Sequence, residues 1–130
     1  MTPEEIIAAD YQNNHAGRQY SAQYAHDIFK KYVASGESYL VVGRTMFLFH
    51  AVDQDTAEFH SINGGSAEDL VHGVNQLLHA LSKHFSKAVT YYDNPRVSDL
   101  ASQGEYPYSI RKIDQGLDRT YELTFNLRGA

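Results

Sequence analysis

The 130-residue sequence has no cysteine, no tryptophan and only three prolines. Without cysteine the chain can form no disulfide bond, thiolate zinc site or cysteine nucleophile, which fits a reducing compartment. Lysine and arginine number 11 against 16 acidic residues and form no cluster, so we expect no nucleic-acid partner. The apolar runs are far shorter than the roughly 20 residues that cross a bilayer, and the first residues carry no basic leader. We therefore expect a cytoplasmic protein with no membrane partner.

The composition is that of a protein with a packed core. Hydrophobic residues make up 42% and charged residues 21% of the chain, and the net charge is −5. At this length the chain has material for one core, so we expect a single domain over residues 1–130.

Four segments have helical spacing of their apolar residues. The third is the longest: Ser66 is placed as its N-cap, and Glu68 and Asp69 give it an acidic first turn. Its apolar positions fall on one face, which we expect to pack on a sheet. The face consists of Leu70, Val71, Val74, Leu77, Leu78, Leu81 and Phe85. The four predicted helices are Pro3 to about Asn13 with Thr2 as N-cap, Tyr20 to Ala34 with an apolar face that includes Tyr24 and Val33, Ser66 to Phe85, and Pro95 to Ala101.

The segments between the helices have the alternation and β-branched content of strands. We predict strands at Ser38–Val42, Thr45–Val52, Thr56–Ile62, Ala88–Tyr92, Tyr106–Arg111 and Thr120–Leu127, with Asp114–Asp118 as a loop. The strand, helix, strand sequence in the middle implies a parallel crossover. The predicted fold is therefore α+β, a mixed and mostly antiparallel sheet flanked by helices in the order α-α-β-β-β-α-β-α-β-β.

One predicted strand carries candidates for a general base. Alternation over Thr56–Ile62 places Glu58 and His60 on the same face, where either side chain could accept a proton. The alternative is that both are ordinary polar residues on the less buried face of the sheet.

The histidines do not have the spacing of a metal site. His72 and His79 are seven residues apart on the polar face of the long helix, so we expect both to face solvent without a metal. His50 and His60 lie on neighbouring strands and could meet across the sheet, but two histidines without a placed carboxylate make a weak site.

The order of elements resembles the GCN5-related N-acetyltransferase (GNAT) family over roughly residues 3–127, without the family's usual opening strand. The resemblance implies that acetyl-CoA lies where two strands of the sheet separate. Its pantetheine would then lie against the backbone of Ser61, Ile62 and Asn63, and its pyrophosphate on the N–H groups of Gly64, Gly65 and Ser66 at a helix start. The residues here differ from the family's glycine pattern, and Ser66, Glu68 and Asp69 fit a helix cap equally well.

A second stretch, Asn94-Pro95-Arg96 with Leu100 and Gly104, is similar to the family signature around its fourth helix. By this resemblance Asn94 is a cofactor-binding residue. The tyrosine that protonates the leaving thiolate in the family is replaced by Ala101, so Tyr106 or Tyr108 would serve as the acid, with Glu58 or His60 as the base.

The resemblance leaves two functions open. The first is an acyl-CoA-dependent N-acyltransferase that transfers acetyl to an amine of a small molecule or protein, of the divergent kind that tailed bacteriophages encode. The second is a non-catalytic protein of the same fold, such as a virion-associated structural part that binds a virion or host protein. An unrelated α+β binding module is a third alternative.

Overall fold

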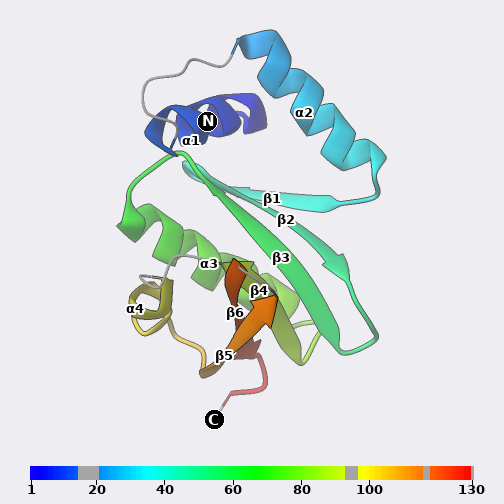
Figure 1. The fold of residues 1–130 in the computed structure, drawn as a ribbon. Helices are drawn as coiled ribbons and strands as arrows, with labels where there is room; N and C mark the ends of the chain where they lie inside the picture. The colour runs from blue at the N-terminus through cyan, green and yellow to red at the C-terminus, as the bar shows by residue number, and fades with distance from the viewer. Residues whose placement is uncertain (15–20, 93–96, 116–117, 130) are drawn as a thin grey trace.

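All strands of the described chain belong to one six-stranded sheet in the order β1-β2-β3-β4-β6-β5 (Figure 1). The computed structural model describes residues 1–14, 21–92, 97–115 and 118–129. The helices are α1 (Pro3–Asn14), α2 (Ala22–Ala34), α3 (Ala67–Leu81) and α4 (Val97–Ala101), and the strands are β1 (Ser38–Val42), β2 (Thr45–Ala51), β3 (Thr56–Asn63), β4 (Lys87–Tyr92), β5 (Tyr108–Gln115) and β6 (Asp118–Asn126). Only β3 and β4 pair in parallel. The predicted α+β class, element order and mixed sheet are confirmed.

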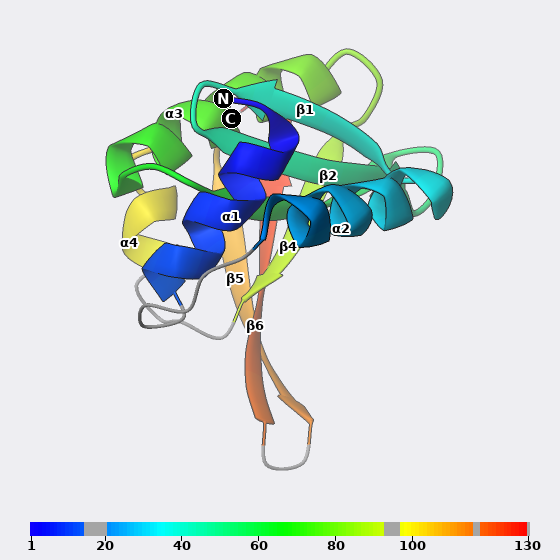
Figure 2. The same ribbon diagram turned by 90° about the horizontal axis from the view of Figure 1, so that it is seen from above.

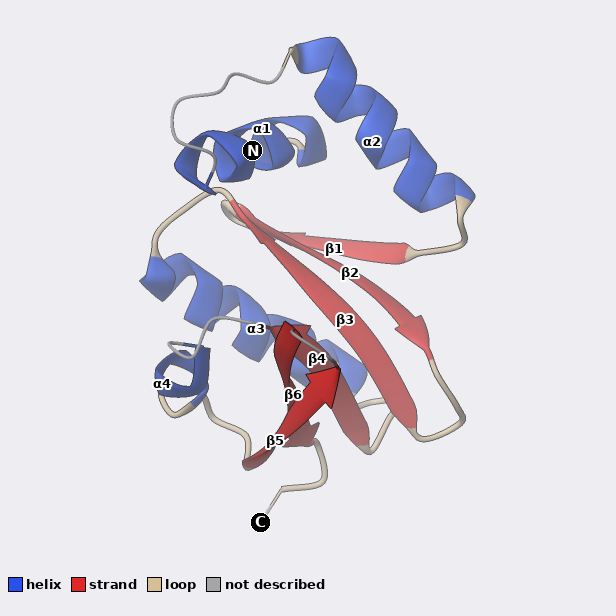
Figure 3. Ribbon diagram, in the orientation of Figure 1, coloured by secondary structure: helices blue, strands red, loops and turns tan. Residues whose placement is uncertain are grey.

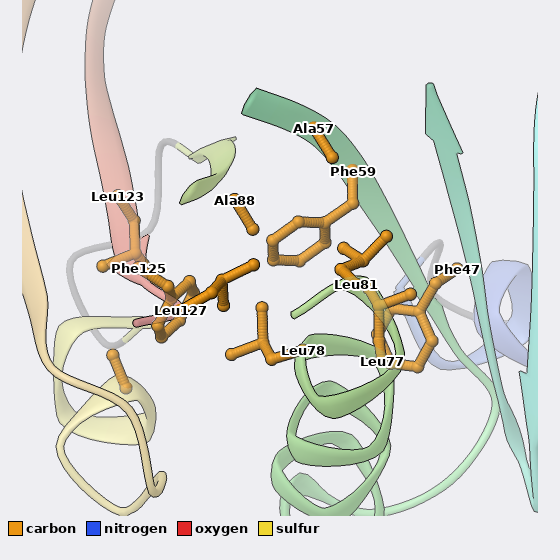
Figure 4. Packing of buried hydrophobic residues seen from close by; sticks show 11 residues of the cluster. Phe47, Ala57, Phe59, Leu77, Leu78, Leu81, Ala88, Leu123, Phe125 and Leu127 are labelled. Carbon is orange, nitrogen blue, oxygen red and sulfur yellow. The ribbon is translucent and has the colours of Figure 1, made fainter. Parts of the chain in front are cut away.

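Helices cover the sheet on both faces. Figures 1 and 2 show α1 and α2 on one face, and α3 with α4 on the other. The α3 side holds the larger core, in which Leu77 and Leu78 are fully buried against Phe59 and Phe125 (Figure 4). A smaller cluster around Ile6 and Met46 lies under α1 and α2. Ala57 and Phe59 of β3 therefore belong to the larger core, while Ile62 on the opposite face packs against the smaller cluster.

The apolar face of α3 is buried unevenly along the helix. Leu77, Leu78 and Leu81 are buried as predicted, whereas Leu70, Val71 and Val74 in the first half are only partly buried. The helix ends at Leu81 and not at Phe85, because the chain must turn there to start β4. After the turn, the N–H of Lys87 donates to the carbonyl of Asp55 at 3.0 Å and opens the parallel ladder.

A glycine lets α3 lie close to the sheet. Gly73 is buried, and a Cβ at this position would collide with the Thr45 hydroxyl and approach the Phe47 ring to 2.9 Å. The Thr45 side chain is itself fully buried and donates to the carbonyl of Val42 at 2.7 Å. Helix propensity alone disfavours glycine at this position, so its place is explained by the close packing.

Two predictions about elements are wrong. Tyr24 and Val33 of α2 are 54% and 46% exposed, because the buried side of α2 is the narrower stripe around Ala25. The predicted loop Asp114–Asp118 is largely strand, since β5 runs to Gln115 and β6 starts at Asp118. Figure 2 shows the far end of this ribbon extending beyond the helices, so no core imposes an apolar alternation on that part of its sequence.

The predicted helix caps are confirmed. Glu5 N–H donates to Thr2 Oγ1 at 3.2 Å, and Asp69 N–H donates to Ser66 Oγ at 3.1 Å. The Asp69 carboxylate in turn accepts from the Ser66 N–H at 2.8 Å, which completes a capping box. This hydrogen bond from the Ser66 backbone, with that of its side chain, lowers the pKa of Asp69 below its ordinary 3.8.

Leu77→Ala should lower the free energy of unfolding by about 2–5 kcal/mol, because it leaves a cavity in the larger core. Urea unfolding measures the change. Val33→Ala on the exposed side of α2 is the control and should stay within about 0.5 kcal/mol of the parent. A Leu77 variant as stable as the control would contradict the packing.

The capping box should make stability depend on acid pH. Because the pKa of Asp69 is lower in the folded state, its stabilisation is present above about pH 3.8 and is lost as the pH falls through the folded-state pKa. Asp69→Asn should therefore show a smaller loss of melting temperature on acidification than the parent. Glu68→Gln removes a carboxylate of the same helical turn and should retain the parent's loss. Equal acid profiles for the parent and Asp69→Asn would refute the assignment.

Candidate functional site

The parallel pair β3 and β4 separates along its length. The ladder joins Thr56 to Lys87, Ala57 to Ala88 and Glu58 to Val89, and it ends there. Both strands continue, β3 to Asn63 and β4 to Tyr92, and Figure 3 shows them diverging. We call the region beyond the last pair the fork.

The backbone at the fork is turned toward the gap. Gly64 N–H donates to the Arg44 carbonyl at 2.8 Å, so the even-numbered residues of β3 bond to β2 and the odd-numbered ones point toward β4. In β4, the bond from Lys87 to Asp55 likewise directs odd-numbered residues toward β3. Beyond the last pair, the N–H and C=O groups of Ser61 and Tyr91 therefore point into the gap, without a strand partner in the described part of the chain. Such groups are suited to bind an extended ligand that carries amides.

An apolar cleft opens on the α3 side of the fork. Counted together with the open solvent at its mouth, it has about 480 Å³ of empty volume. The partly buried first half of α3 forms one wall, and the start of the divergent part of β4 forms another. The lining residues are Phe59, Ser61, Leu70, Val71, Val74, Asn75, Thr90, Val97, Leu100, Ala101, Gly104, Leu123 and Phe125. The partial burial of Leu70, Val71 and Val74 is thus explained, since they face the cleft.

The predicted cofactor-binding residues of β3 divide between the two faces. Ser61 lines the cleft, whereas Ile62 packs against the cluster under α1 and α2. The Asn63 N–H donates to Asp10 Oδ1 at 3.3 Å, and the Asn63 side chain bonds to Gly65 and Ser66 in the following turn. Of the three, Ser61 is the residue whose backbone and side chain both adjoin the cleft.

The predicted pyrophosphate amides already have partners within the chain. Gly64 N–H donates to Arg44, Gly65 N–H to Asn63 Oδ1, and Ser66 N–H to Asp69. The next amides, those of Ala67 and Glu68, belong to the first turn of α3, where a helix supplies no carbonyl partner. Asn94 lies outside the described residues.

On the opposite face, the predicted base Glu58 contacts a histidine. His50 Nε2 lies 3.0 Å from Glu58 Oε2, and His50 Nδ1 lies 3.1 Å from Glu37 Oε1. The antiparallel register pairs His50 with Glu58 and His60 with Leu48, so the suggested meeting of His50 with His60 does not occur. His60 is exposed on the same face as Glu58. The sequence analysis missed the pairing of His50 with Glu58, which only the strand register reveals.

A second polar group lies across the fork from Glu58. The Tyr91 hydroxyl donates to Glu122 Oε2 at 3.1 Å, and Arg111 donates to the same oxygen at 3.2 Å. Burial, followed by the hydrogen bond to Glu122, raises the pKa of Tyr91, and the charge of Glu58 adds to the rise. Carboxylates thus stand on both sides of the fork on this face.

The tyrosines proposed as the acid do not line the cleft. Tyr106 packs against the larger core, and Tyr108 is 39% exposed on β5, beside a separate hollow near Pro107. Ala101, in the place of the family's tyrosine, does line the cleft.

The sequence analysis overlooked Tyr92, which alternation places on the cleft side of β4 with Thr90. Its hydroxyl is buried without a hydrogen-bond partner among the described residues. Burial first, then Tyr121 and Tyr108, raises the pKa of Tyr92, so it holds its proton at neutral pH.

His72 and His79 are exposed on α3, as predicted. In the described part of the chain, no group of three or more His, Cys, Asp or Glu side chains is arranged to hold a metal ion. Within the same residues, no helix has the length and apolar character to cross a membrane.

No protein-family profile matches the sequence, and no curated protein is significantly similar to it. Solved structures match in fold. A chimera of spermidine N-acetyltransferase SpeG from Vibrio cholerae and hSSAT has a TM-score of 0.64 at 12% identity, with 98% of this chain and 93% of that chain covered.

Ribosomal-protein-S18-alanine N-acetyltransferase from Escherichia coli has a TM-score of 0.58 at 13% identity, with 95% and 87% covered. The N-acetyltransferase PseH of Campylobacter jejuni, in complex with acetyl coenzyme A, has a TM-score of 0.57 at 14% identity, with 97% and 92% covered. The overall fold is thus that of the GNAT acetyltransferases, and this chain has the GNAT fold.

Proposed function

We propose that the protein is an acyl-CoA-dependent N-acyltransferase that binds acetyl-CoA at the fork. The observation that carries the proposal is the unpaired backbone of Ser61 and Tyr91 beside an apolar cleft. Pantetheine is an extended chain with two amides and an alkyl thiol end, so it can bond to the free backbone groups and bury its apolar part against Val71 and Leu100.

The start of α3 is the proposed site of the pyrophosphate. Because the N–H groups of Gly64, Gly65 and Ser66 are engaged within the chain, the amides of Ala67 and Glu68 are the free donors there. The Asp69 carboxylate is turned back onto Ser66 by the capping box. We retain Asn94 as a proposed cofactor-binding residue.

Glu58 is the proposed base, with His60 on the same face as the alternative. Glu58 lies at the last pair of the ladder, where the thioester would approach the acceptor face through the fork. The carboxylate takes a proton from the acceptor ammonium, and the neutral amine then attacks the thioester carbonyl carbon. The new N–C bond forms, the C–S bond breaks, and the thiolate takes up a proton while the second amine proton passes to water.

The proton that the thiolate takes up would come from a tyrosine. The proposed donors are Tyr106, Tyr108 and Tyr92. Tyr92 joins the two predicted tyrosines because its hydroxyl is buried on the cleft side of β4 and has no partner among the described residues. The acceptor is an amine of a small molecule or protein; the structural neighbours named above act on spermidine and on a ribosomal protein.

Ala101 favours a second function, binding without catalysis. A buried alanine replaces the tyrosine that the family uses as its acid, so the cleft could bind acyl-CoA or a protein partner without turning it over. A virion-associated role belongs to this alternative.

Acetyl-CoA should raise the melting temperature of the parent. At 100 times its dissociation constant a ligand adds about 2.7 kcal/mol to the native state. Val71→Trp should abolish the shift, because Val71 lines the cleft but is not part of the larger core, so a bulky ring fills the cleft and leaves the core intact. Val33→Trp on α2 is the matched control and should retain the shift. No shift in the parent, confirmed by calorimetry, would refute the proposal.

Glu58→Gln should lower kcat roughly 10²- to 10⁴-fold and leave acetyl-CoA affinity unchanged. The assay follows release of the coenzyme A thiol with spermidine, n-propylamine or an alanine-first peptide as acceptor; the chain has no cysteine and so gives no background. Asp27→Asn, exposed on α2, should turn over like the parent. Full activity of Glu58→Gln would exclude Glu58 as the base, and binding without turnover in the parent would favour the second function.

A further inference from the structure

We propose that His50 is the positioning residue of the acyl transfer: clamped between Glu37 and Glu58, it fixes Glu58 so that one carboxylate oxygen faces the acceptor at the fork. This inference rests on the proposed function.

The clamp has a contact at each end of the imidazole ring. Nε2 lies 3.0 Å from Glu58 Oε2, and Nδ1 lies 3.1 Å from Glu37 Oε1. Each carboxylate can only accept, so a protonated ring nitrogen donates to the carboxylate that it faces. The ring is then attached at two points, which fixes its rotation as well as its place.

Each side chain of the clamp has a defined backbone position. His50 and Glu58 are direct partners in the β2–β3 ladder, and Glu37 precedes Ser38, which pairs with Phe49. The three side chains thus stand in a row across neighbouring strands, with Glu58 as its end at the fork. Glu58 is 23% and Glu37 21% exposed, so both carboxylates are partly shielded from water.

The contact with His50 gives the two carboxylate oxygens of Glu58 different surroundings. Oε2 faces the ring, and Oε1 has no hydrogen-bond partner in the described part of the chain. The proton from the acceptor N–H therefore goes to Oε1, the oxygen turned away from the ring. His50 contributes by holding the carboxylate and does not touch the acyl group or the amine.

Across the fork, Glu122 accepts a hydrogen bond from the Tyr91 hydroxyl and another from Arg111. The Tyr91 hydroxyl is thus given to Glu122 and not to Glu58. Among the described residues, the side chain that lies 3.0 Å from the Glu58 carboxylate is His50.

The test compares His50→Ala and His50→Gln with the parent in the thiol-release assay, and includes a double-mutant cycle with Glu58→Gln. His50→Ala should lower kcat roughly 10- to 100-fold with acetyl-CoA affinity unchanged, a loss below that expected for removal of the base itself. His50→Gln, whose amide can donate to Glu58, should recover part of kcat, and added imidazole should do so in His50→Ala. In the Glu58→Gln background, His50→Ala should have no further effect on kcat. His79→Ala, exposed on α3, is the control.

A second readout needs no turnover. The ¹H–¹³C signals of the His50 ring report its contact with Glu58, and they should move in Glu58→Gln and stay in place in Asp27→Asn. Ring signals indifferent to Glu58→Gln, or a normal kcat in His50→Ala, would overturn the role of His50 while transfer by the parent upholds the proposed function. Absence of acetyl-CoA binding by the parent would overturn the proposed function, and the positioning role with it.

Discussion

The candidate site depends on the early end of one parallel ladder. β3 and β4 share three residue pairs and then separate, although both remain extended. A parallel pair that closed fully would use the backbone of Ser61 and Tyr91 for the sheet and leave nothing for a ligand. The antiparallel partners hold the two strands apart, because β3 is bonded to β2 and β4 is bonded to β6 on the edges that face away from the fork.

The fork also joins two chemically different faces. On the α3 side the lining is apolar. On the other side the polar residues Glu58, His50 and Glu122 lie on β3, β2 and β6 near the end of the parallel ladder. Strand alternation imposes this division, since Phe59 and Ser61 must point opposite to Glu58 and His60. Under the proposed function, a thioester in the apolar cleft would meet an amine beside the carboxylates.

Sequence periodicity predicted the elements that have one buried side and one more exposed side. The buried face of α3 and the alternation of β3 could be read because a core on one side selects apolar residues there. The β5–β6 ribbon was misassigned at Asp114–Asp118. None of the described helices covers this end of the ribbon, so its residues carry no alternation of apolar and polar side chains. The contact of His50 with Glu58 depends on the register between two strands, which a one-residue shift would abolish, and single-strand patterns do not contain that information.

The GNAT fold persists here without the family's glycine motif, and the backbone explains how. A ligand bound by main-chain N–H and C=O groups places few demands on side chains, so the turn at Gly64 and Gly65 is free to serve packing against Arg44 and α1. The positions that set the direction of the backbone are more constrained. They are the start of the ladder at Asp55 and Lys87 and the close packing of α3 on the sheet at Gly73. A divergent sequence can therefore keep this sheet and its cleft while the residues that usually accompany the fold are lost.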